Sequence, residues 1–498
     1  MHHMWEEEVT FQDLMAERLK QAPWLVLSIG LHLVAFLLLW VLIPPEKKEV
    51  IVNQVQMTNQ ETTEIVEPPP PPPPETKPEQ TTEEVVVTEQ QAVSETNDTA
   101  FDNVESDSTA KESAFDSNQW NSAVGMGGGA GGPYGGRGGG GKGKGGGRPY
   151  ATNIDAGLQW LKNHQDEDGK WDCDGFQKHD DPSSEICDGL GNATHDVGVT
   201  GLALLAFLGE GSTMRSGPYS PVIKKGVNWL RKQQDKDTGL FGTKASHDFI
   251  YDHAIASYAM CEAFGLSGYE SLRTVAQNGI NYLESHRNPY SVWRYQPRDN
   301  ENDTSVTGWC IMAYESGEFF KLTINKEALK LCEQWLDQVS DSTGLHGYTR
   351  AGEMSARKGS EHSAKFPVDK GEAMTAVGLF CRFFMKQDPK EKPVMKAAAD
   401  RILAKPPIWD EKAGTIDHYY WYYATYALFQ MGGKHWTDWQ KKLETAVVKN
   451  QLLDKSKKNL YGSWNPVCAW GEDGGRVYST AILVLTLEAL YRYTRLVR

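Results

Sequence analysis

Basic residues are in short supply in this chain. Its 498 residues contain 51 Lys and Arg against 66 Asp and Glu, a formal net charge of −15 at pH 7. About twelve of those fifteen negative charges lie before Tyr150, so the remainder of the chain is only mildly acidic. A chain without a basic surface is a poor partner for nucleic acid.

Cysteine is also scarce, with seven residues in the whole chain, and an odd number leaves at least one thiol unpaired. Cys173 and Cys187 are the only two that flank a single polar insertion, which contains His179. In an oxidising compartment they favour a disulfide, and the alternative is a metal knuckle that also uses His179 or His195. Four others lie in helical patterns and are interpreted as small core residues: Cys261, Cys310, Cys332 and Cys381.

Charge is absent from residues 24–43, a run of twenty residues that is long enough to cross about 30 Å of hydrocarbon. No small-residue cleavage site follows, so we expect a retained membrane anchor rather than a removed signal peptide. Arg18 and Lys20 precede the run and Lys47 and Lys48 follow it, so the count of basic residues gives no orientation.

Residues 44–150 lack the composition of a folded domain. A polyproline stretch at 68–74 is followed by an acidic Thr/Glu/Gln tract and by a Gly-rich run at 125–147. Such segments form tethers and cannot bury a core. We therefore predict four parts, namely a short segment 1–23, a transmembrane helix 24–43, a disordered linker 44–150 and a folded domain 151–498.

The folded domain repeats one pattern six times. Each copy has an amphipathic helix, a Gly/Trp turn, and an Asp or His that opens a second, more apolar helix. The second helices are predicted at 197–208, 254–264, 305–319, 371–384, 419–429 and 479–493. A period of roughly 50 residues indicates a helical repeat array, and the second helices are apolar enough to be buried nearly all round. We predict an all-α (α/α)6 toroid with six inner and six outer helices.

The first copy also carries a family resemblance. The sequence Gly-Leu-Gln-Trp-Leu at 157–161, with Gln165, Gly169 and Trp171, resembles the QW repeat of squalene and hopene cyclases. Residues 151–498 as a whole resemble the toroid of terpenoid cyclases and protein prenyltransferases. The resemblance implies the toroid fold, an apolar substrate, and polar residues at the starts of the inner helices.

This sequence lacks residues that the two best-known activities of that family require. Cyclases protonate an alkene or epoxide with the middle Asp of a D-x-D-D motif; the nearest segment keeps only the last Asp, as Asp303, and has Asn302 in place of the proton donor. An amide cannot supply that proton. Prenyltransferases hold zinc with Asp, Cys and His, and the Cys is missing from the expected place beside Asp303 or Asp417.

The helix starts should meet at one end of the barrel, where Asp and His can bind a metal or act as acid and base. Candidate catalytic residues are Asp303, Asp252, His253, Asp417 and His418. Candidate cavity residues are His195, Asp196, Trp309, Asp369, Tyr419, Tyr420, Arg476 and Tyr478. The alternatives remain open, because Asp is also a common N-cap and the aromatic run at 419–423 is typical of core packing. The sequence assigns no metal or cofactor.

The N-terminal part carries a second resemblance, to TonB-type energy transducers over about residues 10–90. Gln-Ala-Pro-Trp leads into the span at 21–24, Ser28 and His32 lie four residues apart, and a Pro-rich spacer follows. The resemblance implies that Ser28 and His32 contact a proton-channel complex in the inner membrane, since ionisable residues in a bilayer usually face a partner. It also implies a toroid in the periplasm.

Three functions then compete. The preferred one is a membrane-anchored periplasmic binding module whose toroid holds an apolar small molecule, a glycan or a protein and is coupled to the proton channel. The alternative is an enzyme on the same toroid, of terpenoid cyclase-like, prenyltransferase-like or polysaccharide-active type. The third is a structural envelope protein that uses the toroid as a rigid block.

Overall fold

The computed structural model describes residues 28, 30–32 and 149–492, and the chain divides into two units, Met1–Val93 and Ser94–Arg498. In the first unit, Ser28 and residues 30–32 are helical, and Nδ1 of His32 lies 2.8 Å from the carbonyl oxygen of Ser28. The rest of the predicted span and nearly all of the predicted linker lie outside the described residues. Within the described part of the chain, no helix is both long and apolar enough to cross a membrane.

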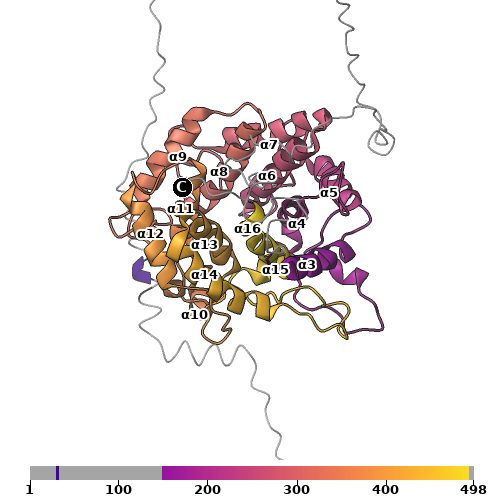
Figure 1. Cartoon of the computed structure of the whole chain (residues 1–498). Coiled ribbons are helices and arrows are strands. Elements are labelled where there is room, and N and C mark those ends of the chain that lie inside the picture. Colours follow the sequence, from indigo (N-terminus) through magenta and orange to yellow (C-terminus); the bar gives the residue numbers. More distant parts are fainter. Residues whose placement is uncertain (1–27, 29, 33–148, 493–498) are drawn as a thin grey trace, which may run out of the picture. The chain divides into compact units, whose positions relative to one another are not determined.

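The second unit contains an inner ring of six helices. They are α4 (Asp196–Glu210), α6 (Phe249–Ser267), α8 (Thr304–Phe319), α11 (Ala373–Phe384), α13 (His418–Met431) and α15 (Gly471–Leu487). Each packs against the next along the chain, and α15 packs against α4, so the ring is closed. Nearly every residue of these helices is buried. Figure 1 shows α15 (yellow) and α4 (magenta) side by side.

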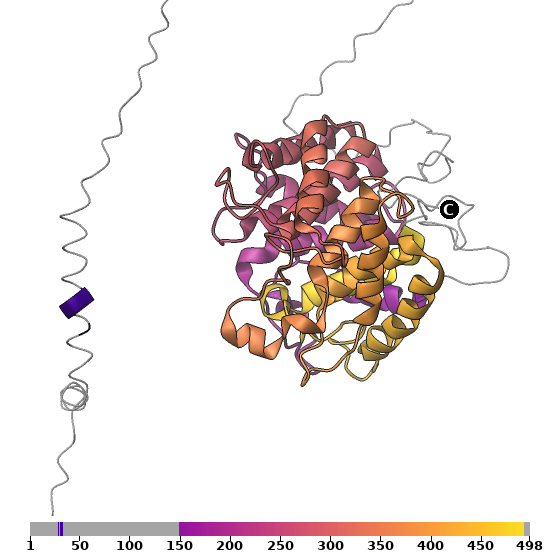
Figure 2. The same cartoon turned by 90° about the vertical axis from the view of Figure 1, so that its left-hand side faces the viewer.

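The outer helices alternate with the inner ones along the chain. They are α3 (Ala151–Asn163), α5 (Ser220–Gln233), α7 (Arg273–His286), α9 (Lys326–Val339), α12 (Pro393–Ala404) and α14 (Gly433–Ala446). Each buries one face only, as in α9, where the buried residues include Trp335 and Leu336. No strand occurs among residues 149–492, and Figure 2 shows helices and loops throughout the domain. The predicted helical toroid is confirmed at this level.

Short elements complete the domain. They are the helices α10 (Ser360–Lys365) and α16 (Ala489–Arg492) and the 3₁₀ turns η2 (Phe176–His179), η3 (Ala193–His195), η4 (Glu270–Leu272), η5 (Val368–Lys370) and η6 (Val448–Asn450).

The Gln and Trp residues of the repeat join the helices to one another. In the first copy, the indole nitrogen of Trp171 donates to the carbonyl oxygen of Leu161, which ties the turn to the end of α3. The side-chain amide of Gln165 donates to the carbonyls of Gly169 and Val222, which ties the turn to α5 in the next copy. These bonds hold the turn against the end of α3 and the first turn of α5.

The same device closes the ring. The amide of Gln451, after α14, donates to the carbonyl oxygen of Asn153 in α3 at 2.8 Å. The contact between the first and last copies is tight, because a Cβ on Gly157 would lie 2.5 Å from Cγ2 of Val484. Closure of the ring therefore depends on a small residue in α3, Gly157, and on a polar residue after α14, Gln451.

The helix starts differ in part from the prediction. Asp303 and Asp417 are N-caps as expected, and they accept hydrogen bonds from the backbone N–H groups of Val306 and Tyr420. By contrast, α6 begins at Phe249, so Asp252 and His253 lie inside its first two turns. The extra turn is formed by apolar residues 249–251, which extend the buried face beyond the predicted start.

Candidate active site

A cavity of about 230 Å³ lies at the N-terminal ends of the inner helices. All six inner helices contribute to its lining, with one residue from each being Val199, Asp252, Ser305, Met374, Tyr419 and Tyr478. The inner helices are parallel around a closed ring, so their starts gather at one end. The loop at 355–358 and Trp470 complete the wall.

His195 and Asp252 form a close pair on this wall. Nδ1 of His195 lies 3.1 Å from Oδ2 and 3.2 Å from Oδ1 of Asp252, and Nε2 lies 4.0 Å from Oδ2 of Asp248. His195 occupies the N-cap position of α4, and Asp252 lies in the first turn of α6. The two side chains come from neighbouring inner helices, which the ring brings together.

The environment moves the pKa values of both members of the pair. Burial raises the pKa of Asp252 to about 6, although the hydrogen bond and charge of His195 oppose that rise. Burial by itself would lower the pKa of His195, but the hydrogen bond and charge of Asp252 outweigh it and raise that pKa above its usual value. A carboxyl and an imidazole in direct contact, each with its pKa moved by the other and by burial, are suited to proton transfer.

Asp303 is a second carboxyl connected to the cavity, through two tyrosines. Its side chain is fully buried, and burial raises its pKa to about 7. The hydroxyl of Tyr348 donates to Oδ2 of Asp303 at 3.4 Å and lies 2.7 Å from the hydroxyl of Tyr295. Both tyrosines line the cavity. When Asp303 is protonated, its carboxyl can donate to Tyr348 instead, and Tyr348 can then donate to Tyr295, which connects the carboxyl to the cavity.

Aromatic rings form much of the remaining wall. Trp309 lies in the cavity and stacks on Tyr422, with ring centroids 5.9 Å apart and an angle of 9° between the planes. The hydroxyl of Tyr419 lies 2.8 Å from that of Ser305. The buried hydroxyl of Tyr478 has no hydrogen-bond partner in the described residues.

Two basic side chains reach the cavity and are held by acids. A terminal nitrogen of Arg357 lies 3.0 Å from Oδ2 of Asp417, the N-cap of α13, and the Arg357 guanidinium lies over the ring of Trp470. Lys358 is paired with Asp473. Asp417 thus positions a basic cavity residue and caps α13 with its other carboxylate oxygen.

Several predicted site residues lie away from the cavity. His253 is fully buried, its Nδ1 accepts from the N–H of Phe241, and its Nε2 lies 3.1 Å from the carbonyl of Gly279. His418 is buried against Trp409 and Trp421, and burial lowers its pKa to about 3. These two histidines stabilise the packing between inner helices and their surroundings, and neither lines the cavity.

Four further predicted residues are engaged elsewhere. Asp196 accepts from Lys170 and from the N–H of Cys173. Asp369 is exposed beside Lys370, and Tyr420 donates to the carbonyl of Lys405. Arg476 is buried and paired with Asp188, beyond a kink at Gly475 whose φ is 64°. The reason is common to all four, since their side chains point toward outer helices or loops rather than into the ring.

Sequence reasoning also missed residues that line the cavity. Tyr251, Tyr295 and Tyr348 are buried or half-buried and face it. Tyr251 directly precedes Asp252, and Tyr295 lies in the turn of the third copy, after Trp293 and Arg294. Their positions in the repeat could therefore have indicated both as cavity residues. The loop at 355–358 lies outside the repeat, so no sequence pattern indicated that it lines the cavity.

The predicted disulfide is not formed. Cys173 and Cys187 are both free and buried, as are the other five cysteines. The thiol of Cys187 donates to the carbonyl oxygen of Asn459 at 3.0 Å, and the backbone N–H of Cys173 donates to Asp196. Each cysteine is therefore held in a separate set of contacts.

Comparisons with known proteins give a likeness of architecture. No protein-family model and no curated protein matches the chain. Among solved structures, the GH76A α-1,6-mannanase of Salegentibacter sp. HEL1_6 is 11% identical, covers 68% of this chain and 98% of its own, and has a TM-score of 0.45. The unsaturated glucuronyl hydrolase of Bacillus sp. GL1 is 14% identical, covers 70% of this chain and 99% of its own, and has a TM-score of 0.47. A variant of the type II terpene cyclase MstE of Scytonema is 12% identical, with coverages of 68% and 97% and a TM-score of 0.42.

The preferred sequence-based function, a ligand- or protein-binding module, is corrected here. The similar structures are enzymes, several of them sugar-active by name. At such low identity the likeness concerns the fold, so the chemistry must be argued from this chain's own residues. The cavity supplies that argument, because His195 and Asp252 are in contact on its wall, and a paired imidazole and carboxyl can exchange a proton with a bound ligand.

Proposed function

We propose that this chain is an enzyme that carries out acid–base chemistry on a carbohydrate in the toroid cavity. The observation that carries the proposal is the pair formed by Asp252 and His195, which lines the cavity and in which burial raises the pKa of Asp252 to about 6. Perturbed titratable groups in a concave site are typical of catalysis.

A carbohydrate fits the wall better than a hydrocarbon does. Sugar rings present apolar C–H faces that pack on aromatic rings, and their hydroxyls need polar partners. The cavity offers both, with Trp309 and Trp470 beside Asp248, Lys358 and Asp473. A terpenoid substrate offers no hydroxyls to these polar groups, so it would use only the aromatic part of the wall.

The two carboxyls divide the chemistry between them. Asp252 is mostly ionised at pH 7 and accepts a proton from the attacking water. Asp303, with a pKa of about 7, is the acid: its protonated carboxyl donates to the Tyr348 oxygen, Tyr348 passes its own proton to Tyr295, and Tyr295 passes its proton to the leaving oxygen. The glycosidic C–O bond breaks, a new C–O bond forms to the water oxygen, and the protons balance between base and acid.

The test combines binding with turnover, using the full chain in detergent. A glycan array that includes α-1,6-mannan and glycosaminoglycan fragments identifies bound sugars, and each bound sugar is then incubated with the chain and analysed by mass spectrometry. We expect cleavage of at least one bound glycan. If no glycan binds, the carbohydrate substrate is wrong, and if a glycan binds but stays intact, the enzymatic function is wrong.

The placement of the enzyme is a separate proposal. We propose that the uncharged run at 24–43 anchors the chain in the inner membrane with the toroid in the periplasm, and that Ser28 and His32 contact a proton-channel complex. The support is the length of the run and a histidine within it. In cells, His32→Ala should abolish crosslinks from the span to a membrane partner, whereas Gly30→Ala should retain them; identical crosslinks in both variants would contradict the coupling.

A further inference from the structure

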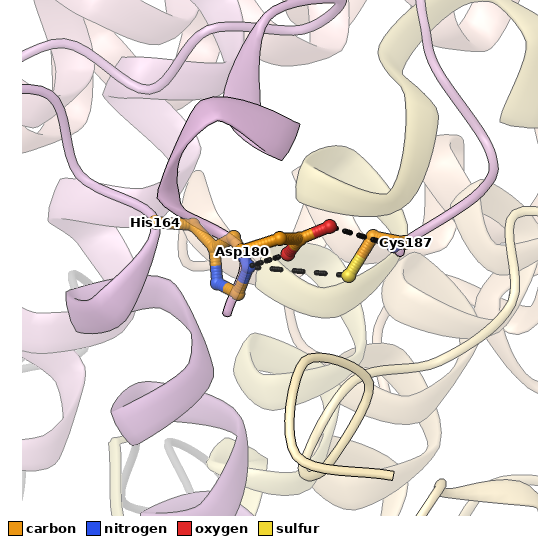
Figure 3. A group of neighbouring side chains, drawn as sticks. All are labelled: His164, Asp180 and Cys187. Carbon is orange, nitrogen blue, oxygen red and sulfur yellow. Dashed lines mark hydrogen bonds and ion pairs between the residues drawn. The ribbon is translucent and has the colours of Figure 1, made fainter. Parts of the chain in front are cut away.

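Three side chains with metal-binding atoms meet at a buried point outside the cavity (Figure 3). His164 follows the C-terminal end of α3, and Asp180 and Cys187 belong to the insertion that follows it. One ligand atom from each lies within 4.8 Å of the other two. Nε2 of His164 lies 3.1 Å from Oδ1 of Asp180 and 3.9 Å from Sγ of Cys187.

These separations suit a single zinc ion. Zinc binds histidine nitrogen and carboxylate oxygen at about 2.0 to 2.2 Å and cysteine sulfur at about 2.3 Å in a tetrahedral arrangement, so its ligand atoms lie roughly 3.3 to 3.6 Å apart. The observed distances of 3.1 and 3.9 Å lie on either side of that range. In Figure 3 the imidazole, carboxylate and thiol point toward one another from three chain segments.

The surroundings orient the three side chains. Nδ1 of His164 lies 2.8 Å from the carbonyl oxygen of Trp160, so Nδ1 carries a proton and donates it to that acceptor. Nε2 then faces the other two groups, as in metal sites where a second hydrogen bond fixes the histidine ring. Oδ2 of Asp180 accepts from the backbone N–H of Cys187 at 2.7 Å, which leaves Oδ1 directed at Nε2.

A cation accounts for this arrangement better than the protein groups alone. The side chain of Asp180 is fully buried, and in the described part of the chain its only ion-pair partner is His164. With Nδ1 already donating, the neutral imidazole would turn a lone pair toward a carboxylate oxygen at 3.1 Å. Either a second imidazole proton or a metal ion must lie between them, and the thiol beside both provides the further ligand that a metal needs.

We propose that His164, Asp180 and Cys187 bind a structural Zn²⁺ ion. On binding, the ion displaces the thiol proton of Cys187 to solvent, and the thiolate and carboxylate together balance the charge of the metal. The carbonyl of Asn459, which accepts from the Cys187 thiol at 3.0 Å, or a water supplies the fourth ligand.

The site joins the two ends of the ring. Trp160 and His164 belong to the first copy, and Asn459 belongs to the last. The indole nitrogen of Trp160 donates to the carbonyl of Asn459 at 2.7 Å, and the side chain of Asn459 donates to the carbonyls of Asp181 and Glu185. A metal at this point fixes the insertion against α3 and the loop before α15.

A second cluster of acids in the same region carries no such proposal. Asp172, Asp174 and Asp196 lie close together, but Lys170 and Lys178 already neutralise Asp172, and Lys170 also pairs with Asp196.

The test measures zinc in the full chain and in matched variants. Cys187→Ser and Asp180→Asn remove proposed ligands, whereas Cys173→Ser and His179→Gln change a cysteine and a histidine of the same region that lie outside the cluster. We expect about one zinc per chain by elemental mass spectrometry in the wild type and in both controls, and its loss in both ligand variants. His2 and His3 are present in all five proteins and cancel in the comparison.

A second measurement uses the wild type alone, so that it does not depend on a variant that fails to fold. After removal of metal with a chelator, Co²⁺ should restore one site with the absorption of thiolate-to-cobalt charge transfer. Zn²⁺ at 100 times its Kd should raise the Tm of the apo protein by about 5 °C, and Mg²⁺ should not. Absence of the cobalt band, or equal zinc in the wild type and Cys187→Ser, would overturn the proposal and leave a His164–Asp180 ion pair.

Discussion

Nδ1 of His195 lies 3.1 Å from Oδ2 of Asp252, across the junction of two neighbouring inner helices and at the wall of the cavity. Neither residue is needed as a helix cap, since the His195 side chain makes no capping bond and α6 begins before Asp252. Their pairing therefore serves the cavity more directly than it serves the helices.

Removal of the Asp252 carboxylate should abolish turnover with little loss of stability. Asp252→Asn keeps the size of the side chain and removes the base, so kcat should fall by about 10²- to 10⁴-fold. Asp369→Asn is the matched control, because Asp369 is exposed and lies away from the cavity. The measurement is kcat with the glycan identified in the array, together with Tm; a Tm loss of about 10 °C in Asp252→Asn would instead give Asp252 a structural role.

Activity should pass through a maximum between about pH 6 and pH 7. The base, Asp252, must be ionised, so kcat/KM rises with pH through its pKa of about 6. The acid, Asp303, must be protonated, so kcat/KM falls as pH rises through its pKa of about 7. Tyr348→Phe interrupts the route from Asp303, and we expect it to remove the alkaline limb. A wild-type profile that keeps rising up to pH 9 would exclude Asp303 as the acid.

Two substitutions separate the acid role of Asp303 from its role as an N-cap. Asn caps helices as well as Asp does, so Asp303→Asn should keep Tm and lose turnover, whereas Asp303→Ala should also lose about 0.5 to 2 kcal/mol of stability. Asn325→Ala, which removes the cap of α9, is the control for cap loss alone and should retain turnover. If Asp303→Asn keeps full activity, then Asp303 is only a cap.

A buried carboxyl in α8 should make stability fall as pH rises. Burial raises the pKa of Glu315 in the folded state to about 7, above the value of about 4.3 expected in the unfolded chain. The folded state therefore binds more protons between these values, and the stabilisation present at pH 4 is lost as pH rises to 7. Glu315→Gln lacks this titration, so its stability relative to the wild type should rise between pH 5 and pH 8, by at most about 1.4 kcal/mol per pH unit. Urea unfolding at both pH values measures the difference, and a constant difference would contradict the raised pKa.

The sequence predicted the ring well and the cavity in part. The repeat fixes inner helices through runs of apolar residues, and the caps Asp303 and Asp417 follow from local backbone chemistry. The residues at a helix start that face the cavity depend on where the helix begins. In α6 the three apolar residues before Asp252 are helical, so the helix begins earlier than predicted. Packing between copies of the repeat turns the His253 side chain toward the carbonyl of Gly279 and brings the Tyr348 hydroxyl to Asp303. A single sequence does not show this packing.

All seven cysteines should be titratable as thiols without a reductant. In the folded structure every one is free and buried, and Cys173 and Cys187 lie in separate contacts. Alkylation of the native chain should be slow because burial hinders access and, as at Cys187, raises the thiol pKa to about 12. Alkylation in denaturant with a chelator should label all seven, counted by mass spectrometry. A count of five labelled cysteines would indicate one disulfide. A proteolytic digest that linked Cys173 to Cys187 would show that the insertion around the proposed zinc ligands folds differently.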